Sequence, residues 1–145
     1  MTYSLHVILR FELEREMLAG TVTPADLPEA FDAKLRSYLG VEPADVVEGV
    51  LQDVHWSDSG FGYFPTYALC NVISLQLWER ATSELGDIEA QFGRGEFDPL
   101  REWLGEHVHR WGRTFEPAEL LERVVGGGLD PEPYLAYLRQ KVEAL

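Results

Sequence analysis

Proline and glycine divide this sequence into segments of helical length, and their spacing limits the fold more than any other feature. A polar residue precedes proline in four places: Thr23-Pro24, Asp98-Pro99, Glu116-Pro117 and Asp130-Pro131. Proline is tolerated in the first helical turn because its missing N–H would have no partner there. A glycine follows five apolar-periodic runs, at Gly20, Gly40, Gly86, Gly112 and Gly126. Glycine commonly ends a helix in the left-handed conformation, so the pattern predicts an all-α chain.

We expect a compact, bundle-like domain of about six to eight helices. The predicted helical ranges are residues 2–19, 24–39, 63–85, 87–92, 99–111, 117–125 and 131–145. Apolar residues at helical spacing predict the inward faces of three of them. These faces are Leu5, Leu9, Leu13 and Met17 with Ile8; Leu27, Phe31, Leu35 and Leu39; and Leu135, Leu138, Val142 and Leu145. Cys70 lies in an apolar stretch and is expected to be a buried, inert thiol.

Residues 41–61 are the exception to the helical pattern. Glu42-Pro43 interrupts the preceding helix, and no helical period follows it. Val50, Val54 and Trp56 alternate roughly, which allows a short strand. A non-helical insert in a helical chain is where functional residues are often found.

Composition excludes several classes of partner. Among 145 residues, 12 are Lys or Arg and 25 are Asp or Glu, giving a formal net charge of −13. This balance argues against nucleic acid and against anionic membrane surfaces. The length favours a single domain over residues 1–145. One cysteine permits no intramolecular disulfide, and no targeting or membrane-spanning segment is evident, so we expect a cytoplasmic protein.

The sequence contains no established metal-binding or phosphate-binding motif. None of the four histidines belongs to a His-Glu-x-x-His motif. His107 and His109 diverge on a helix and most simply belong to a solvated surface, although a metal site between copies of the chain stays a minor alternative. Gly126-Gly127-Gly128 follows a predicted helix, which favours a connection over a phosphate cradle.

The insert and its flank collect an amide, a carboxylate, an imidazole and two phenols. They belong to Gln52, Asp53, His55, Tyr63 and Tyr67. Such groups can bind a carboxylate or stabilise an oxyanion. The structural alternative is that Asp53 caps or forms a salt bridge while the rings pack, and the residue types leave both open.

Residues Gly49–Trp56 match Gly-x-x-Gln-Asp-x-His-Trp, and this segment resembles a signature of the M32 family of zinc metallocarboxypeptidases. The flanking residues 2–14, 26–30, 61–69 and 133–138 resemble the same family in the same order. The resemblance covers essentially the whole chain but only the C-terminal part of the larger, mostly helical family enzymes.

The resemblance implies roles for individual residues. His55 and Tyr63 would be the catalytic residues that stabilise an oxyanion or contact substrate. Gln52, Asp53 and Tyr67 would support substrate binding, and Arg10 is a further candidate for an ion pair or a substrate contact. The family's zinc ligands lie in its upstream part, and a catalytic zinc needs about three protein ligands. We therefore expect no metal or cofactor on this chain, whereas full-length family members carry zinc.

Two functional hypotheses follow from the resemblance. The first is a truncated relative without peptidase activity of its own, which acts as a binding or regulatory protein. It would be a homo-oligomer, with a dimer favoured because exposed apolar helix faces need cover, and its partners would be peptides or a full-length relative. The alternative is the C-terminal fragment of an active zinc carboxypeptidase that removes C-terminal residues from peptides.

Overall fold

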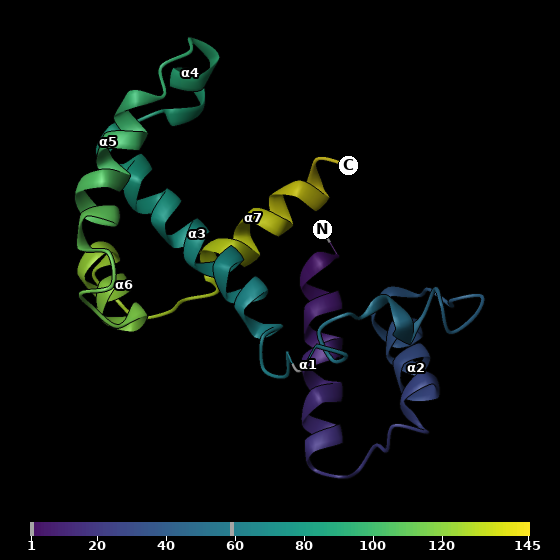
Figure 1. Ribbon diagram of the computed structural model, residues 1–145. Coiled ribbons are helices and arrows are strands. Elements are labelled where there is room, and N and C mark those ends of the chain that lie inside the picture. The colour runs from purple at the N-terminus through teal and green to yellow at the C-terminus, as the bar shows by residue number, and fades with distance from the viewer. Residues whose placement is uncertain (1, 59) are drawn as a thin grey trace. The chain divides into compact units, whose positions relative to one another are not determined.

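The computed structural model describes residues 2–58 and 60–145 (Figure 1). The elements are α1 (Tyr3–Leu18), α2 (Leu27–Leu39), η1 (Val50–Gln52), α3 (Pro65–Leu85), α4 (Ile88–Gly93), α5 (Asp98–His107), η2 (His109–Trp111), α6 (Pro117–Val125) and α7 (Glu132–Glu143). In these ranges every regular element is an α-helix or a short 3₁₀ helix, which confirms the all-α prediction. No helix among the described residues has the length and apolar character needed to cross a bilayer.

The chain divides into two compact units, Met1–Leu69 and Cys70–Leu145, and α3 begins in the first and ends in the second. Each unit has its own buried apolar cluster. The first contains Leu9, Leu13, Phe31, Leu35 and Val50, and the second contains Ala81, Ile88, Trp103 and Val124. The expectation of a single domain over residues 1–145 stays a prediction.

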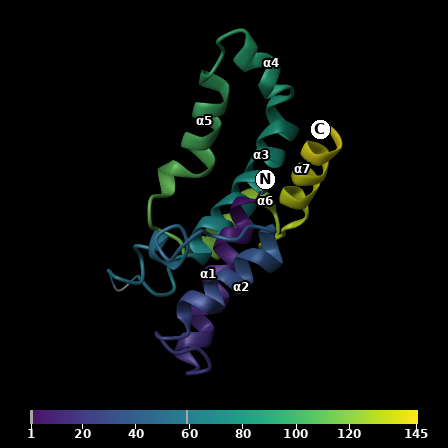
Figure 2. The ribbon, with the colours of Figure 1, turned by 90° about the vertical axis from the view of Figure 1, so that its right-hand side faces the viewer.

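In the first unit, α2 lies against α1 (Figure 1 and Figure 2). Leu9 and Leu13 are fully buried against Phe31 and Leu35, as the helical spacing predicts. Gly40 ends α2 with φ 66°, a left-handed conformation that costs glycine little. The helix begins at Leu27, later than the predicted Pro24, because residues 24–26 form a turn.

The first two turns of α1 differ from the prediction. Leu5 and Ile8 are 37% and 40% exposed, while Val7 is buried. In these two turns, the side of α1 that is not exposed lines a pocket, described below, instead of packing on α2. The side chains on that side are mostly polar, so apolar periodicity does not reveal this face.

The connection from α2 to α3 contains η1, so of the two alternatives for residues 41–61, a non-helical segment or a short strand, the structure describes no strand at residues 50–56. The amide of Asp53 donates to the carbonyl of Val50 at 3.1 Å, which closes a 3₁₀ turn. Val50 is buried, but Leu51 and Val54 are 62% and 66% exposed. The apolar residues here therefore have no partner strand to pair with, and only Val50 joins the core.

In the second unit, the predicted helix over residues 99–111 is two elements. Val108 adopts φ −120° and ψ −62°, so α5 ends at His107 and η2 follows. Gly126 ends α6 at φ 81°. The three glycines form a connection, as expected, and Gln76 holds it: its Nε2 donates to the carbonyl of Gly128 at 2.9 Å and its Oε1 accepts from the amide of Asp130 at 3.1 Å.

Two expectations of burial in the second unit are wrong. Cys70 is exposed. The apolar residues near it lie on several sides of α3, and only some of these sides are buried. Leu135 and Val142 on α7 are 36% and 58% exposed, and Leu145, beyond the end of α7, is 91% exposed. Helical spacing predicts which side chains share a face, but burial also requires an element that packs on it.

Glu84 makes the stability of the second unit depend on pH. The Trp103 indole N–H donates to Glu84 Oε2 at 2.6 Å, and this bond, with the nearby Arg80 and His107, lowers the pKa of Glu84. A carboxyl whose pKa is lower in the folded state stabilises the fold above its unfolded pKa, about 4.3 for Glu, and loses this contribution as the pH falls through its folded value.

We therefore expect acidification from about pH 6 to about pH 3 to destabilise the wild type more than Glu84→Gln, which keeps an acceptor for the indole. The measurement is the urea midpoint of the second unit at each pH. Equal acid sensitivity of the two proteins would contradict the assignment.

Candidate functional site

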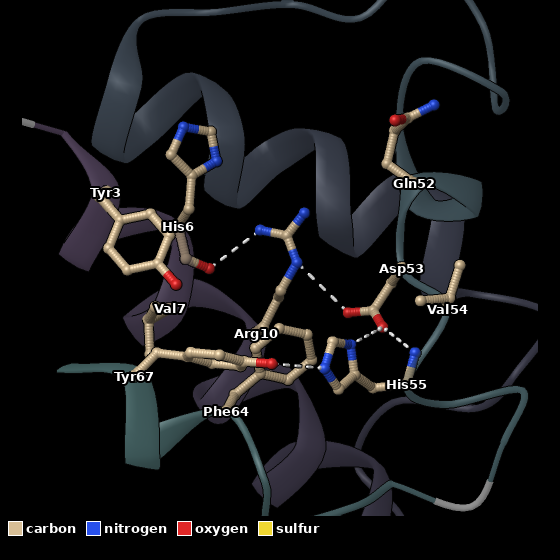
Figure 3. Close-up of a pocket in the computed structure, with 10 residues that line it drawn as sticks. All are labelled: Tyr3, His6, Val7, Arg10, Gln52, Asp53, Val54, His55, Phe64 and Tyr67. Atoms are coloured by element: carbon tan, nitrogen blue, oxygen red, sulfur yellow. Dashed lines mark hydrogen bonds and ion pairs between the residues drawn. The ribbon is translucent and has the colours of Figure 1, made fainter. Parts of the chain in front are cut away.

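A pocket of about 400 Å³ lies in the first unit (Figure 3). Two segments far apart in the sequence form most of it, namely the N-terminal half of α1 and the residues that follow η1. The start of α3 closes it. The lining residues are Tyr3, His6, Val7, Arg10, Gln52, Asp53, Val54, His55, Phe64 and Tyr67.

The α1 side of the pocket is one helical face. Tyr3, His6, Val7 and Arg10 are spaced i, i+3, i+4 and i+7, which places them in line along the helix. On the opposite side, the backbone is extended at Asp53, with φ −90° and ψ 110°. The Asp53 side chain accepts from the amide of His55 at 2.8 Å, and this local bond fixes the course of the chain across the pocket.

Arg10 and Asp53 form an ion pair within the pocket. Arg10 Nε lies 3.2 Å from Asp53 Oδ2, and the side chains are 13% and 0% exposed. Arg10 Nη1 donates to the carbonyl of His6 at 2.9 Å. The guanidinium carbon lies 5.1 Å from the ring centre of Phe31 and 5.6 Å from that of Phe64. Among the ten lining residues, the hydrogen bond and the ion pair drawn to the Arg10 guanidinium engage Nη1 and Nε, and none is drawn to Nη2 (Figure 3).

Burial sets the electrostatics around Arg10. Burial lowers the pKa of Arg10, and the neighbouring Asp53 carboxylate opposes that shift. Burial also lowers the pKa of His6, with a smaller contribution from the Arg10 charge. Since His6 is then neutral at pH 7, Arg10 is the cation of the α1 face. Burial removes water from the charged guanidinium, and a second anion beside Arg10 would stabilise the charge in place of that water.

His55 lies between an acid and a phenol. Its Nε2 shares a hydrogen bond with the Tyr67 hydroxyl at 3.2 Å, while its Nδ1 faces Asp53 Oδ1 at 3.7 Å. This arrangement favours the tautomer with the proton on Nδ1, so that Nε2 accepts from Tyr67. Burial, with smaller contributions from Tyr63 and Tyr3, raises the pKa of Tyr67, which keeps its hydroxyl protonated.

The structure brings together five of the six candidate residues identified from the sequence. Arg10, Gln52, Asp53, His55 and Tyr67 all line the pocket. Gln52 donates its Nε2 to the carbonyl of Val47 at 2.6 Å, which directs its amide toward the insert backbone.

Tyr63, the sixth candidate, does not line the pocket. It is 52% exposed and stacks on His55, with ring centres 5.7 Å apart. The catalytic and substrate-binding roles of all six residues stay predictions.

Sequence reasoning missed the contributions of Tyr3, His6, Val7 and Phe64 to this pocket. The spacing of residues 3, 6, 7 and 10 could have indicated a shared face. Side chains of the insert also make the structural contacts expected as the alternative to function. Asp53 forms a salt bridge, and Trp56 packs edge-on against Phe31 with ring centres 6.4 Å apart.

The residues that the structure describes do not fit a catalytic zinc ion. Among the described residues, no group of three or more His, Cys, Asp or Glu side chains is arranged to hold a metal. In the pocket, Asp53 is engaged by Arg10, and His55 is hydrogen-bonded to Tyr67. These two side chains are therefore already paired within the chain.

A buried guanidinium beside an imidazole and a phenol defines a site suited to a carboxylate or carbonyl oxygen, here set in a helical fold. The chain belongs to the Carboxypeptidase Taq (M32) metallopeptidase family, whose model matches residues 1–142. This confirms the resemblance seen in the sequence.

Similar proteins include thermostable carboxypeptidase 1 of Thermus thermophilus, 47% identical over all of this chain and 28% of its own length. Carboxypeptidase 1 of Bacillus subtilis is 38% identical over all of this chain and 29% of its own length. The crystal structure of the M32 carboxypeptidase from Deinococcus radiodurans superposes with a TM-score of 0.93 at 46% identity, covering 97% of this chain and 29% of that one. This chain thus spans less than a third of the length of these relatives.

Proposed function

We propose that this chain forms a substrate-binding wall of a carboxypeptidase site and does not hydrolyse peptide bonds by itself. The pocket of the first unit binds the C-terminal residue of a peptide through its free α-carboxylate. The observation that carries the proposal is Arg10: its side chain is 13% exposed and held through Nε and Nη1, and no hydrogen bond or ion pair to Nη2 is drawn among the lining residues (Figure 3). The names of the relatives, all carboxypeptidases, support a peptide C-terminus as the ligand.

Each residue has a distinct task in this proposal. Arg10 pairs with the α-carboxylate through Nη2, because charge-assisted bonds to guanidinium are strong where water is excluded. Asp53 holds the guanidinium in place and orients the His55 ring. Tyr67 and His55 form the polar side of the pocket and face the carbonyl oxygen of the bound residue. In the family the zinc ion supplies the activated water, and none of the steps above requires it.

Calorimetry with a pair of peptides tests the proposal. An N-acetylated tripeptide with a free C-terminus should bind at least about tenfold more tightly than the same peptide as its C-terminal amide. With zinc added, the purified chain should release no free amino acid from either peptide. Equal affinities would contradict carboxylate recognition, and release of the C-terminal residue would contradict the lack of hydrolysis.

A second candidate is that this chain works as the C-terminal portion of a complete zinc carboxypeptidase site. The close superposition on 29% of the D. radiodurans enzyme favours it. Mixing the chain with the remaining portion of the T. thermophilus relative, produced separately, tests it. Release of C-terminal residues only from the mixture would support this candidate, and an inactive mixture that nevertheless forms a complex would contradict it.

We also propose self-association, with a dimer favoured. The exposed apolar side chains of α7, Leu135 and Val142 among them, support it because association would remove them from water. Light scattering over a range of concentrations tests the proposal, and a monomer at every concentration would contradict it.

A further inference from the structure

We propose that Glu14 is a positioning residue for this pocket, and that its buried carboxylate holds both ends of the loop between His55 and Tyr63. We call residues 55–62 the histidine loop, of which the structure describes 55–58 and 60–62. The inference rests on the proposed function, because the position of the His55 ring, on which Tyr63 stacks, matters most if His55 faces a bound peptide.

Glu14 is 2% exposed and belongs to α1. Its two oxygens accept from opposite ends of the histidine loop. The Trp56 indole Nε1 donates to Oε1 at 3.1 Å, and the backbone amide of Gly62 donates to Oε2 at 3.0 Å. Trp56 directly follows His55, and Gly62 directly precedes Tyr63. One carboxylate therefore fixes the residue next to each of the two rings.

The histidine loop also bonds to itself. The amide of Gly60 donates to the carbonyl of His55 at 2.7 Å. A Cβ atom at Gly60 would lie 3.0 Å from that same oxygen, so glycine permits this close approach. Gly62 adopts φ 80°, a conformation that side chains other than glycine rarely take. These features set the course of the described loop residues near His55, Gly60 and Gly62, whereas the bonds to Glu14 hold Trp56 and Gly62 against α1.

A role in stability alone explains Glu14 poorly. In the part of the chain that the structure describes, the ion pairs of α1 involve Arg10, Glu12 and Glu16 but not Glu14. Burying a carboxylate without a cation costs free energy that an apolar side chain in the same place would not. The planar carboxylate of Glu14 does, however, fix the directions of its two hydrogen bonds, and these two bonds together specify one position of the loop.

The first test compares Glu14→Gln with Glu12→Gln. Glutamine keeps the size of Glu14 but offers only one acceptor oxygen and directs an NH₂ group at one of the two N–H donors. Glu12 lies on the same helix and also accepts two bonds, from Tyr38 and Lys34, outside this pocket. It is thus a matched control for losing a carboxylate from α1.

The readout is the proton NMR spectrum of the His55 ring, which lies among the rings of Tyr63, Phe64 and Tyr67. We expect Glu14→Gln to move the His55 signals toward those of an exposed histidine and to weaken peptide affinity about tenfold. His107, in the second unit, should not move. Glu12→Gln should leave the His55 signals and the affinity unchanged. Movement of His55 no larger in Glu14→Gln than in Glu12→Gln would overturn the proposal.

Trp56→Phe keeps the test decisive if Glu14→Gln does not fold. It removes the indole donor and leaves an aromatic ring, and it should shift the His55 signals in the same direction by a smaller amount. Unchanged His55 signals in a folded Trp56→Phe protein would also overturn the proposal. If His55 moves as expected but the wild type binds no peptide, Glu14 positions the loop and the proposed function is the part that fails.

Discussion

Replacing Arg10 with methionine is expected to lower the free energy of unfolding of the first unit by about 3 kcal/mol. Methionine fills much of the same space, but the Asp53 carboxylate, whose side chain is fully buried, then has no cation. Removing one member of a buried ion pair leaves an uncompensated charge, which costs more than the pair itself contributes. Urea unfolding followed by NMR signals of α1 and α2 measures the change.

Asp53→Asn provides the control for the ion pair. Combined with Arg10→Met, it removes the uncompensated charge and should recover more than half of the lost stability. If the single Arg10→Met variant loses less than about 1 kcal/mol, the pair contributes no more than an exposed salt bridge does, and the account of Arg10 as a buried guanidinium is wrong.

Leu9→Ala should destabilise the first unit by about 3 kcal/mol, since Leu9 is fully buried in the cluster with Leu13 and Phe31. The loss combines the transfer of apolar surface with the cavity left behind. Leu5→Ala, on the same helix but 37% exposed, should cost less than about 1 kcal/mol. The same unfolding measurement compares the two, and equal losses would contradict the assignment of the buried face.

Much of the fold could be predicted from the sequence because local chemistry decides where helices end. The glycines after apolar runs at residues 40 and 126 do end helices in the left-handed conformation. Burial was predicted less well, since it depends on which element packs against a face. Leu9 packs against residues of α2, whereas Leu135 and Val142 on α7 belong to neither of the two described apolar clusters and are exposed.

The site could be predicted in part for a similar reason. Gln52, Asp53 and His55 are adjacent in a recognisable segment, so their grouping required no knowledge of the fold. The contribution of His6 and Glu14 depends on how α1 packs against a segment more than 40 residues later. From the sequence, Glu14 would be expected to lie in solvent. The structure shows that it is buried and accepts hydrogen bonds from Trp56 and Gly62.

The most direct test of the central claim is an NMR titration of the wild-type chain that follows its four histidines. An N-acetylated tripeptide with a free C-terminus should shift His55 and His6, which line the pocket, and leave His107 and His109 unchanged. The C-terminal amide of the same peptide should shift none of them at the same concentration. Equal shifts with the amide, or shifts confined to His107 and His109, would contradict the claim that this pocket binds a peptide carboxylate.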